Sequence, residues 1–441
     1  MKRIALEIKA LSGLAIGLRK PGGSVSEADD FISGTVIRGA IAAQILRSHK
    51  AQHPRSSSNE SSTEEVGGDF QALFLSDTPA IFQNAYPATL KYKGEVLQEN
   101  VGSVSVLPAT AVSSKNKSGF CRKDENRRCT GEGNGVFDTL IDRFCAEAYG
   151  YPCEPNCPKD RGRVDAYTGF YAIHEGEYYK LSADKRLLTR VGINRRRATA
   201  EEQILYSIEI LNESQEKKQT PAIYTSAILV SNDQIAKDLY EFINKHHQDF
   251  RLGGAASRGL GKVEIKAQEL TEVQLSIKKR IEEFNNELIN RWQFWRQVFG
   301  NPKDELEDRL FFTIDLQADT ILTEHWQRTI VISEAMLAQY LNLEDVKENS
   351  LELHAAYSSY SYRSGWNSAW GLMKDVELVT NRGAVYLLSI DKTKVSEDKE
   401  DAWIEALTNL EMKGVGDRTC EGFGQVRVCD KFHLVFREDA V

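Results

Sequence analysis

Apolar residues recur with two different periods along the N-terminal part of this chain. Residues 3–9 alternate apolar and polar side chains, which is the pattern of a half-buried strand. A helix is predicted to begin at Ser33, because apolar side chains follow it at four-residue spacing, at Ile37, Ile41 and Ile45. Residues 223–230 form a second β-rich run, and Asn232 opens a second predicted helix. A further strand follows this helix, so the order strand–helix–strand occurs twice and indicates a ferredoxin-like, or split βαβ, unit.

The C-terminal part repeats this organisation after a long amphipathic helix. Residues 271–299 keep apolar and aromatic side chains at helical spacing, and we interpret these aromatic positions as core packing. Residues 311–316 and 383–390 are predicted strands, and residues 401–410 are a predicted helix. We therefore divide the chain into an N-terminal domain (residues 1–270), a linking helix (271–300) and a C-terminal domain (301–441).

Two segments interrupt the N-terminal domain. Residues 48–68 are rich in Ser and Glu and are expected to form a mobile surface loop. Residues 74–77 and 80–86 look like strands. Residues from about 100 to 180 contain most of the cysteines and no clear hydrophobic period, so we expect an irregular insertion with little apolar material.

One glycine pattern occurs twice, each time after a predicted helix and before a predicted strand. The first copy consists of Gly253, Gly259, Leu260, Gly261 and Val263, and the second of Gly416, Gly422, Phe423, Gly424 and Val426. Glycine permits positive φ and close backbone approach, and successive exposed N–H groups can form a nest for a phosphate. The alternative for each copy is a tight turn that leads into an edge strand. The repetition and the neighbouring arginines Arg251, Arg258 and Arg418 favour phosphate binding.

The chain carries a net charge of −8, so any nucleic-acid site must be a local basic patch. Residues 185–197 contain such a patch, with Arg190, Arg195, Arg196 and Arg197 around a short Val-Gly-Ile run. Arginine binds phosphate bidentately, although a solvated basic surface is the alternative. Arg38 lies near a predicted helix N-terminus, which also favours anions, and an ion pair at the edge of the core is its alternative role.

The cysteines and the start of the chain bear on compartment and metal binding. The first residues look like a strand and not a secretory signal, and no apolar run approaches the ~20 residues of a membrane span, so we expect a cytoplasmic protein. Five of the seven cysteines fall between residues 121 and 157. Disulfides are not expected in that compartment, so the cluster indicates a structural Zn²⁺ site with four thiolate ligands: Cys121, Cys129, Cys153 and Cys157. Cys145 could replace one ligand, and free buried thiols are the alternative.

Several motifs together resemble a known family. Residues 32–40 (ISGTVIRGA) look like the helix start of RAMP proteins in CRISPR effectors, with Ser33 where the family pattern often has proline. Residues 74–77 and 84–87 are similar to the next stretch, and the two glycine loops match the family's C-terminal signature. Residues 189–195 (TRVGINR) and 364–367 (SGWN) are more specific. Together they resemble the large RAMP subunit of type III-D CRISPR complexes, a member of the Cas-five-like group.

The resemblance implies an α+β protein of two tandem ferredoxin-like (RRM-type) domains. It also implies a binding site for the 5′ repeat-derived tag of the guide RNA, beside the large polymerase-like subunit and the first backbone subunit. The predicted RNA-binding residues are those of the basic patch and the first glycine loop, together with Arg38: Arg38, Arg190, Arg195, Arg196, Arg197, Gly253, Gly254, Arg258, Gly259 and Gly261. The second glycine loop has Asp417 and Glu421 close by, so we expect it to shape a turn or a subunit interface.

Two rival functions stay open at this point. The first is a RAMP endoribonuclease that processes guide precursors or cuts target RNA. Backbone subunits of type III complexes use an aspartate in an early loop for cutting, and Asp29 and Asp30 precede the helix start here, where we expect them to be solvated. The second rival is a protein-only scaffold. The primary hypothesis is a non-catalytic RNA-binding subunit.

Overall fold

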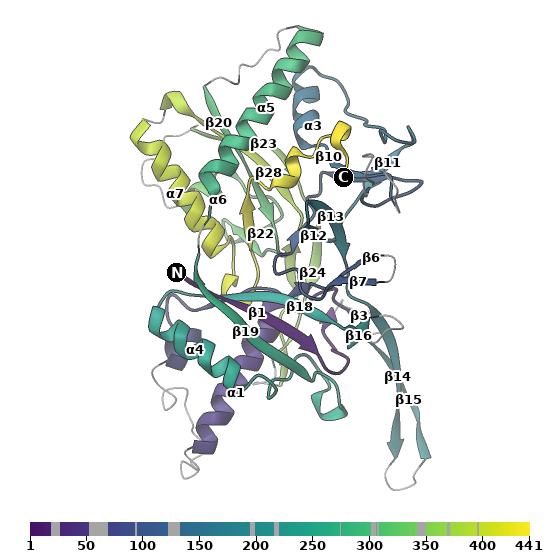
Figure 1. Cartoon of the computed structure of the whole chain (residues 1–441). Coiled ribbons are helices and arrows are strands. Elements are labelled where there is room, and N and C mark those ends of the chain that lie inside the picture. Colours follow the sequence, from purple (N-terminus) through teal and green to yellow (C-terminus); the bar gives the residue numbers. More distant parts are fainter. Residues whose placement is uncertain are drawn as a thin grey trace.

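The computed structural model describes the 441-residue chain apart from residues 19–26, 53–68, 93–94, 122–132, 195–198, 216–219, 274, 301–305, 307, 342–349, 368–370 and 395–396. The described residues form seven α-helices and several antiparallel sheets. Figure 1 shows two main units stacked end to end, with the chain's N-terminus near their junction and the C-terminus in the upper one. Most of the predicted mobile loop lies outside the described residues.

The lower unit contains a sheet with the strand order β19-β1-β18-β4. These strands are β1 (Lys2–Ala10), β4 (Ile81–Phe82), β18 (Ile223–Val230) and β19 (Val263–Glu272), and β5 (Tyr86–Pro87) also pairs with β18. Alternate residues of β1 are buried, and they pack with apolar side chains of α1 (Gly34–Gln52) and α4 (Asp233–Lys245). Both helices therefore cover the same face of the sheet. The predicted cap of α4 is confirmed, because the Asn232 side chain accepts hydrogen bonds from the amides of Gln234 and Ile235.

The upper unit contains a second sheet with the order β23-β28-β20-β29. Its strands are β20 (Arg309–Leu316), β23 (Leu351–Tyr357), β28 (Val385–Asp391) and β29 (Val426–Val428). Three helices pack in its core: α5 (Ile277–Phe299), α6 (Glu334–Leu341) and α7 (Glu397–Lys413). The predicted core role of the α5 stripe is confirmed at Ile281, Phe284, Leu288 and Trp292, which are buried. If the four strands of each sheet are numbered along the chain, both sheets have the spatial order 4-1-3-2.

The segment expected to be an irregular insertion is regular in large part, so that expectation was wrong. It forms two three-stranded sheets, one of β9 (Ala111–Ser114), β10 (Val136–Asp138) and β11 (Val164–Ala166), the other of β8 (Ser105–Val106), β12 (Phe170–His174) and β13 (Glu177–Leu181). Helix α3 (Leu140–Ala148) buries Leu140, Ile141 and Cys145 in the core of the upper unit. Phe432 and Val435 of the C-terminal tail complete an apolar cluster within the segment. Its core was hidden in the sequence because the tail supplies part of it.

The remaining elements are short, and a strand predicted at 74–77 is absent. Phe74 ends α2 (Asp69–Phe74), whose buried Phe70, Leu73 and Phe74 have the i, i+3, i+4 spacing of a helix, and residues 75–77 form the turn after it. Small strand pairs are β2 (Gly17–Leu18) with β3 (Glu27–Ala28), β6 (Leu90–Tyr92) with β7 (Glu95–Gln98), and β16 (Ser214–Gln215) with β17 (Thr220–Pro221). No described helix is long and apolar enough to cross a membrane.

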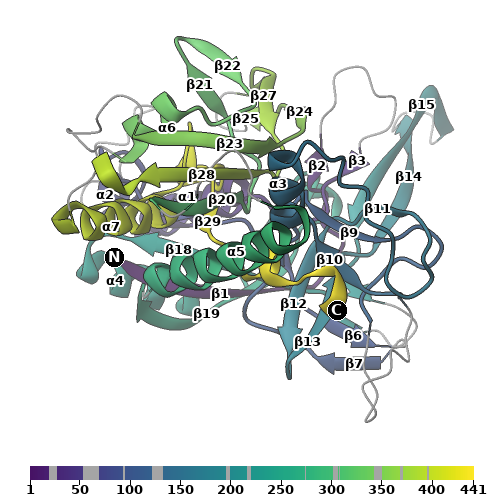
Figure 2. The same cartoon turned by 90° about the horizontal axis from the view of Figure 1, so that it is seen from above.

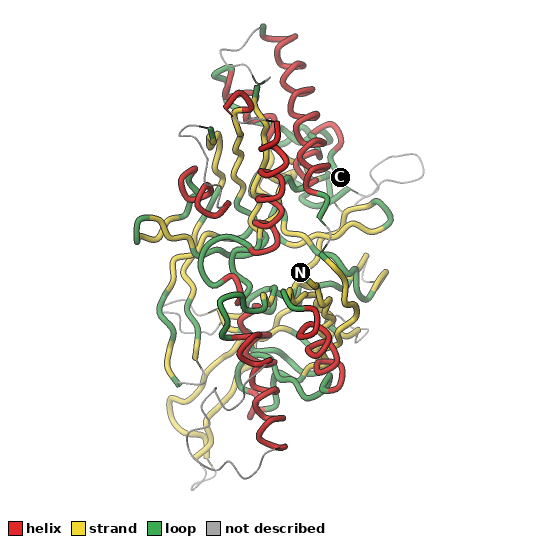
Figure 3. Tube along the Cα trace, turned by 90° about the vertical axis from the view of Figure 1, so that its left-hand side faces the viewer, coloured by secondary structure: helices red, strands yellow, loops and turns green. Residues whose placement is uncertain are grey.

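A long hairpin projects from the lower unit. It consists of β14 (Lys185–Asn194) and β15 (Thr199–Leu211), with Lys185 paired to Leu211 at its base. Figure 3, viewed from the left side of Figure 1, shows the hairpin reaching away from both units. Residues 185–194 of the predicted basic patch lie on this hairpin.

Candidate nucleic-acid interface

The two glycine loops have the same backbone conformation. In the first, Ala255 (φ 57°, ψ 30°) and Gly259 (φ 86°, ψ 10°) flank one turn of 3₁₀-helix at Ala256–Arg258. In the second, Arg418 (φ 60°, ψ 33°) and Gly422 (φ 91°, ψ 7°) flank Thr419–Glu421 in the same way. Glycine is favoured at the second of these positions because other residues rarely adopt positive φ. The repeated sequence pattern therefore encodes a repeated local structure.

Most glycines of the first loop are explained by packing within the protein. A Cβ atom would lie 2.5 Å from the Ala15 carbonyl oxygen at Gly253 and 2.6 Å from the Leu252 carbonyl oxygen at Gly261. The amides of Gly254 and Gly261 donate to the carbonyls of Ala15 and Gly13, so they do not face an anion. This result corrects the expectation that these amides form a phosphate nest. At Gly259 a Cβ would meet no atom within 4 Å, so this glycine faces open space.

The first glycine loop contacts the projecting hairpin. The Arg190 guanidinium of β14 donates to the Arg258 carbonyl at 3.3 Å, and the Arg258 guanidinium donates to the Tyr206 hydroxyl of β15. The same guanidinium lies 5.6 Å from the centre of the Tyr206 ring. Two residues predicted separately to bind RNA, Arg190 and Arg258, therefore meet at one place. Arg195, Arg196 and Arg197 lie outside the described residues.

The charges of the hairpin divide into two groups. Lys185 pairs with Asp30 at 2.5 Å and Arg186 with Glu213 at 2.8 Å, so the base of the hairpin is neutralised. In the described part of the chain, Arg190 and Arg258 make no ion pair with a carboxylate. Arg258 is exposed and Arg190 is half-buried, and two arginines without a carboxylate partner at one place suit an anionic ligand.

Apolar side chains line the opposite face of the hairpin from Arg190. Leu187 and Val191 are 58% and 47% exposed, and they alternate with Arg186 and Arg190 along β14. Because successive side chains of a strand point to opposite faces, Leu187 and Val191 lie on the face away from Arg186 and Arg190. The arginine face can contact phosphates of a single strand, and these exposed apolar side chains lie behind it.

Arg38 does not join this group. Its guanidinium donates to the Phe74 carbonyl at 2.8 Å and lies 5.3 Å from the centre of the Phe74 ring. The start of its helix is also occupied, because the Gly34 amide donates to the Asn84 side chain at 2.8 Å. These contacts place Arg38 at the edge of the core, with a carbonyl and a ring in place of the expected ion pair, and its predicted RNA contact stays a prediction.

The second glycine loop is packed against the lower unit. A Cβ at Gly422 would lie 2.6 Å from Asn84 Oδ1, and the Asn84 amide donates to the Gly422 carbonyl at 3.0 Å. The Thr35 hydroxyl donates to the Glu421 carbonyl at 3.3 Å. The loop thus forms part of the contact between the two units of one chain. From the sequence we expected this loop to shape a turn or a contact with another subunit. The structure shows it in contact with the other unit of the same chain.

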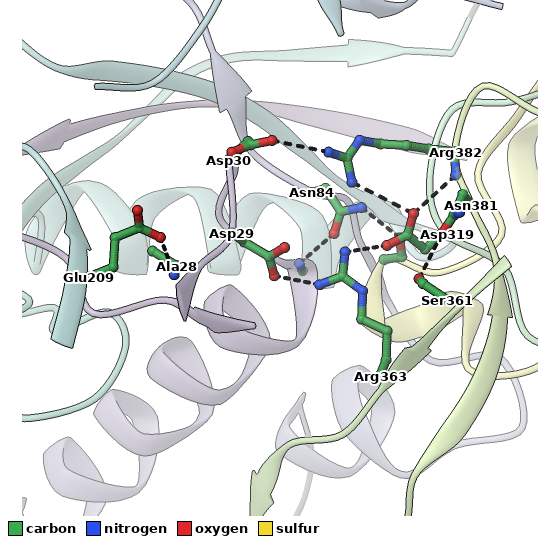
Figure 4. A network of polar contacts seen from close by, with 12 residues as sticks. Ala28, Asp29, Asp30, Asn84, Glu209, Asp319, Ser361, Arg363, Asn381 and Arg382 are labelled. Atoms are coloured by element: carbon green, nitrogen blue, oxygen red, sulfur yellow. Dashed lines mark hydrogen bonds and ion pairs between the residues drawn. The ribbon is translucent and has the colours of Figure 1, made fainter. Parts of the chain in front are cut away.

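The two early aspartates take part in an ionic network at the same junction, in which Asp29 is buried and Asp30 is exposed, as expected for Asp30 (Figure 4). Asp29 is only 7% exposed and pairs with Arg363 at 2.5 Å, and Arg363 also pairs with Asp319. Arg382 pairs with Asp30 and Asp319 at 3.6 and 3.7 Å. Burial raises the pKa of Asp29, and Arg363 opposes this effect. The expectation that Asp29 is solvated was wrong, because the upper unit covers it.

The cysteines of the predicted zinc site are only partly described. Cys121 is disulfide-bonded, Cys153 and Cys157 are free thiols, and Cys129 lies outside the described residues. The described residues contain no group of three or more His, Cys, Asp or Glu side chains arranged to hold a metal. A cysteine in a disulfide cannot also be a thiolate ligand, so zinc binding at Cys121 requires the reduced protein. The zinc site stays a prediction.

A model of a known protein family matches part of this chain. The model of the RAMP superfamily matches residues 7–264, which is more than half of the chain. The chain belongs to the RAMP superfamily. The match covers the hairpin, the first glycine loop and the lower sheet apart from the start of β1 and most of β19, so the candidate nucleic-acid interface lies within it.

Solved structures show weaker similarity. A chain of the type III-B Cmr-beta complex bound to cognate target RNA and AMPPnP has a TM-score of 0.38 and 12% identity, over 91% of this chain and 93% of that chain. A second structure of Cmr-beta with cognate target RNA has a TM-score of 0.36 and 11% identity, over 91% and 94% of the two chains. No curated protein matches the chain.

Sequence reasoning missed Tyr206 as a member of the site. Tyr206 is the direct cross-strand partner of Arg190, so a predicted hairpin register would have placed it beside the arginines. Arg363 and Arg382 were also missed, because they are more than 330 residues away from Asp29 and no local pattern links them.

Proposed function

We propose that this RAMP protein is a non-catalytic RNA-binding subunit of a type III-D CRISPR ribonucleoprotein. In this role it holds the 5′ repeat-derived tag of the guide RNA and contacts the large polymerase-like subunit and the first backbone subunit. Family membership and the motifs at residues 189–195 and 364–367 support the assignment. The two βαββαβ units with the same strand order support tandem ferredoxin-like RAMP domains.

The meeting of Arg190 and Arg258 is the observation that carries the proposal. Their guanidinium groups lie where the exposed hairpin meets the first glycine loop. Arginines of this kind bind phosphates of a single strand, and Tyr206, the cross-strand partner of Arg190, supplies an aromatic surface on which a base can pack. The site is open on the side of Gly259, so an RNA backbone can approach closely.

The contacts of the early aspartates support a non-catalytic role. An aspartate that assists RNA cleavage must reach a metal or a proton in the substrate. Asp29 is buried against Arg363, and Asp30 is paired with Lys185. We therefore expect no cleavage of repeat RNA or target RNA by the chain, with or without Mg²⁺. Cleavage that Asp29→Ala abolishes would reject the non-catalytic assignment.

Binding of a guide-like RNA tests the proposed site. Removal of one phosphate contact lowers the slope of log affinity against log salt by about 0.7 for single strands. Arg190→Gln combined with Arg258→Gln should therefore weaken binding and lower this slope by about 1.4 in a fluorescence-anisotropy titration. Arg186→Gln is the matched control, because this arginine lies on the same hairpin but pairs with Glu213. Equal effects of the control and the double variant would place the RNA elsewhere.

A structural zinc in the insertion is a separate proposal. Its ligands would be Cys121, Cys129, Cys153 and Cys157, with about one Zn²⁺ per chain in reduced protein. Elemental analysis of protein purified under reducing conditions measures it. A zinc content that Cys153→Ser and Cys157→Ser leave unchanged would reject this ligand set.

A further inference from the structure

One tight turn of the upper unit exposes a tryptophan in an unfavourable backbone conformation. Strands β21 (Leu322–Glu324) and β22 (Gln327–Thr329) are joined by the two residues His325 and Trp326, with φ values of 48° and 64°. Positive φ at both positions is the geometry of a type I′ turn, which favours Asn-Gly. Trp326 is nevertheless 99% exposed. The sequence thus places a bulky side chain where it strains the backbone and contacts almost nothing within the chain, which points to a function outside the chain.

A second hairpin beside this turn also exposes large apolar side chains. It runs from β24 (Tyr360–Arg363) through β25 (Trp366–Asn367) and β26 (Leu372–Met373) to β27 (Glu377–Thr380). Five of its residues are at least half exposed: Tyr360, Tyr362, Leu372, Met373 and Val376. Arg328 of β22 pairs with Glu377 of β27 at 2.7 Å, and Figure 2 shows the two hairpins side by side. We call these two hairpins the docking face.

The charges of the docking face do not suit a nucleic acid. Arg328 is neutralised by Glu377 and Asp417, and Lys374 pairs with Glu421 at 3.4 Å. Asp375 is exposed and has no cationic partner among the described residues. A phosphate backbone needs free cations, and this face differs in that respect from the junction of Arg190 and Arg258. Trp, Tyr and Met are enriched in the cores of protein–protein interfaces.

We propose that the docking face binds another protein subunit, and that Trp326 inserts into an apolar pocket rimmed by Lys or Arg. Asp375 has no cationic partner among the described residues, so a basic rim on the partner would complement this face. This inference rests on the proposed function, because it assumes that the chain works within an assembly of several subunits. It adds the surface through which one of these subunits is held.

A double substitution separates docking from folding. His325→Asn with Trp326→Gly creates the preferred type I′ sequence, so it keeps the hairpin and relieves the strain. The melting temperature of the free chain should not fall. The other subunits of the complex, purified as an assembly without this chain, are titrated onto the immobilised chain. Because Trp is a frequent interface hot spot, we expect the dissociation constant to rise by about 30-fold or more.

Two controls make the result specific. Phe294→Ala removes another exposed aromatic residue, from α5, and should leave the dissociation constant unchanged. Hydrogen exchange of residues 322–329 and 360–380 should slow when the assembly binds. The affinity of the isolated chain for guide-like RNA should be the same with and without the double substitution.

The other possible outcomes reject either the docking face, its proposed partner or the proposed function. An unchanged dissociation constant, or no slowing of exchange in the two hairpins, would reject the docking face. Weaker RNA binding by the substituted free chain would assign the face to nucleic acid instead. Self-association that depends on Trp326, measured by analytical ultracentrifugation, would assign it to a second copy of this chain. If the unsubstituted chain binds neither the assembly nor RNA, the proposed function itself fails.

Discussion

The first and second glycine loops share a backbone but differ in their surroundings. Both contain one 3₁₀ turn between a residue in the left-handed region and a glycine with φ near 90°. Around Gly259 there is open space, whereas Gly422 lies against Asn84 of the other unit. The position before this glycine is Arg258 in the first loop and Glu421 in the second. Arg258 points to the hairpin, and Glu421 contacts Thr35 at the junction of the units.

The comparison shows that one loop geometry serves two purposes. The glycines determine the local conformation, because a side chain at a glycine position would clash with a neighbour or require a strained φ. The residues between the glycines determine what the loop contacts. A cation beside open space allows an anionic ligand, whereas a carboxylate that accepts from Thr35 and pairs with Arg418 and Lys374 holds two parts of the same chain together.

The largest expected difference between the loops concerns stability. A Cβ at Gly422 would lie 2.6 Å from Asn84 Oδ1 and 2.9 Å from the Phe82 carbonyl oxygen, at a φ of 91°. Gly422→Ala should therefore lower the free energy of unfolding by about 3 kcal/mol, the sum of a packing clash and an unfavourable φ. Gly259→Ala should cost only about 1 kcal/mol, because the strain in φ acts alone there. Urea denaturation of both variants measures the difference, and equal losses would refute the contrast in surroundings.

A smaller difference is expected in RNA binding. Gly259→Val places a branched side chain in the open space next to Arg258 and should reduce affinity for guide-like RNA about tenfold, or 1.4 kcal/mol. Gly176→Val is the matched control, because Gly176 also has positive φ (80°) and open space but lies in the β12–β13 turn. Circular dichroism checks that both variants are folded. If Gly422→Val is folded and reduces the affinity as much, the RNA lies at the junction of the units and not on the hairpin.

The smallest effect concerns the charge of Glu421. Burial disfavours its ionised form, but Arg418 and Lys374 outweigh burial and hold the pKa of Glu421 below its usual range. Such a group stabilises the fold above its unfolded-state pKa of about 4.3, and this stability is lost as pH falls through the lower folded-state pKa. Glu421→Gln should cost about 1 kcal/mol at pH 7, with a difference from the unsubstituted chain that shrinks below about pH 4. Thermal melts at several pH values measure it, and a pH-independent difference would exclude the ionic contribution.

Much of the fold was accessible from the sequence because it depends on local patterns. The strand–helix order of the lower unit, the Asn232 cap and the apolar stripe of α5 follow from periodicity and capping chemistry within short windows, whereas α6 and β23 of the upper unit were missed. The segment from about 100 to 180 was not accessible in this way. Its strands are only two to five residues long, and its apolar cluster includes Phe432 and Val435 from the tail. A core assembled from distant segments leaves no period in any one of them.

The arginines of the candidate site could be predicted from the sequence, but most of their contacts could not. Arg190 and Arg258 could be selected from the sequence, because basic residues beside a glycine motif are visible in one dimension. Their contact, and the place of Tyr206 between them, required the hairpin register and the fold of the loop. Arg38 was selected by the same reasoning, but the tertiary structure places it against Phe74 instead.

The sequence by itself determined where the chain can turn left-handed, where helices begin and which residues carry charge. These properties depend on the residue and its near neighbours. Only the tertiary structure decided that Asp29 is buried against Arg363, that one glycine loop is open while the other is covered, and that Trp326 stands exposed. Such outcomes depend on how segments hundreds of residues apart pack together, because this packing decides which charges are buried with a partner and which are left for a ligand.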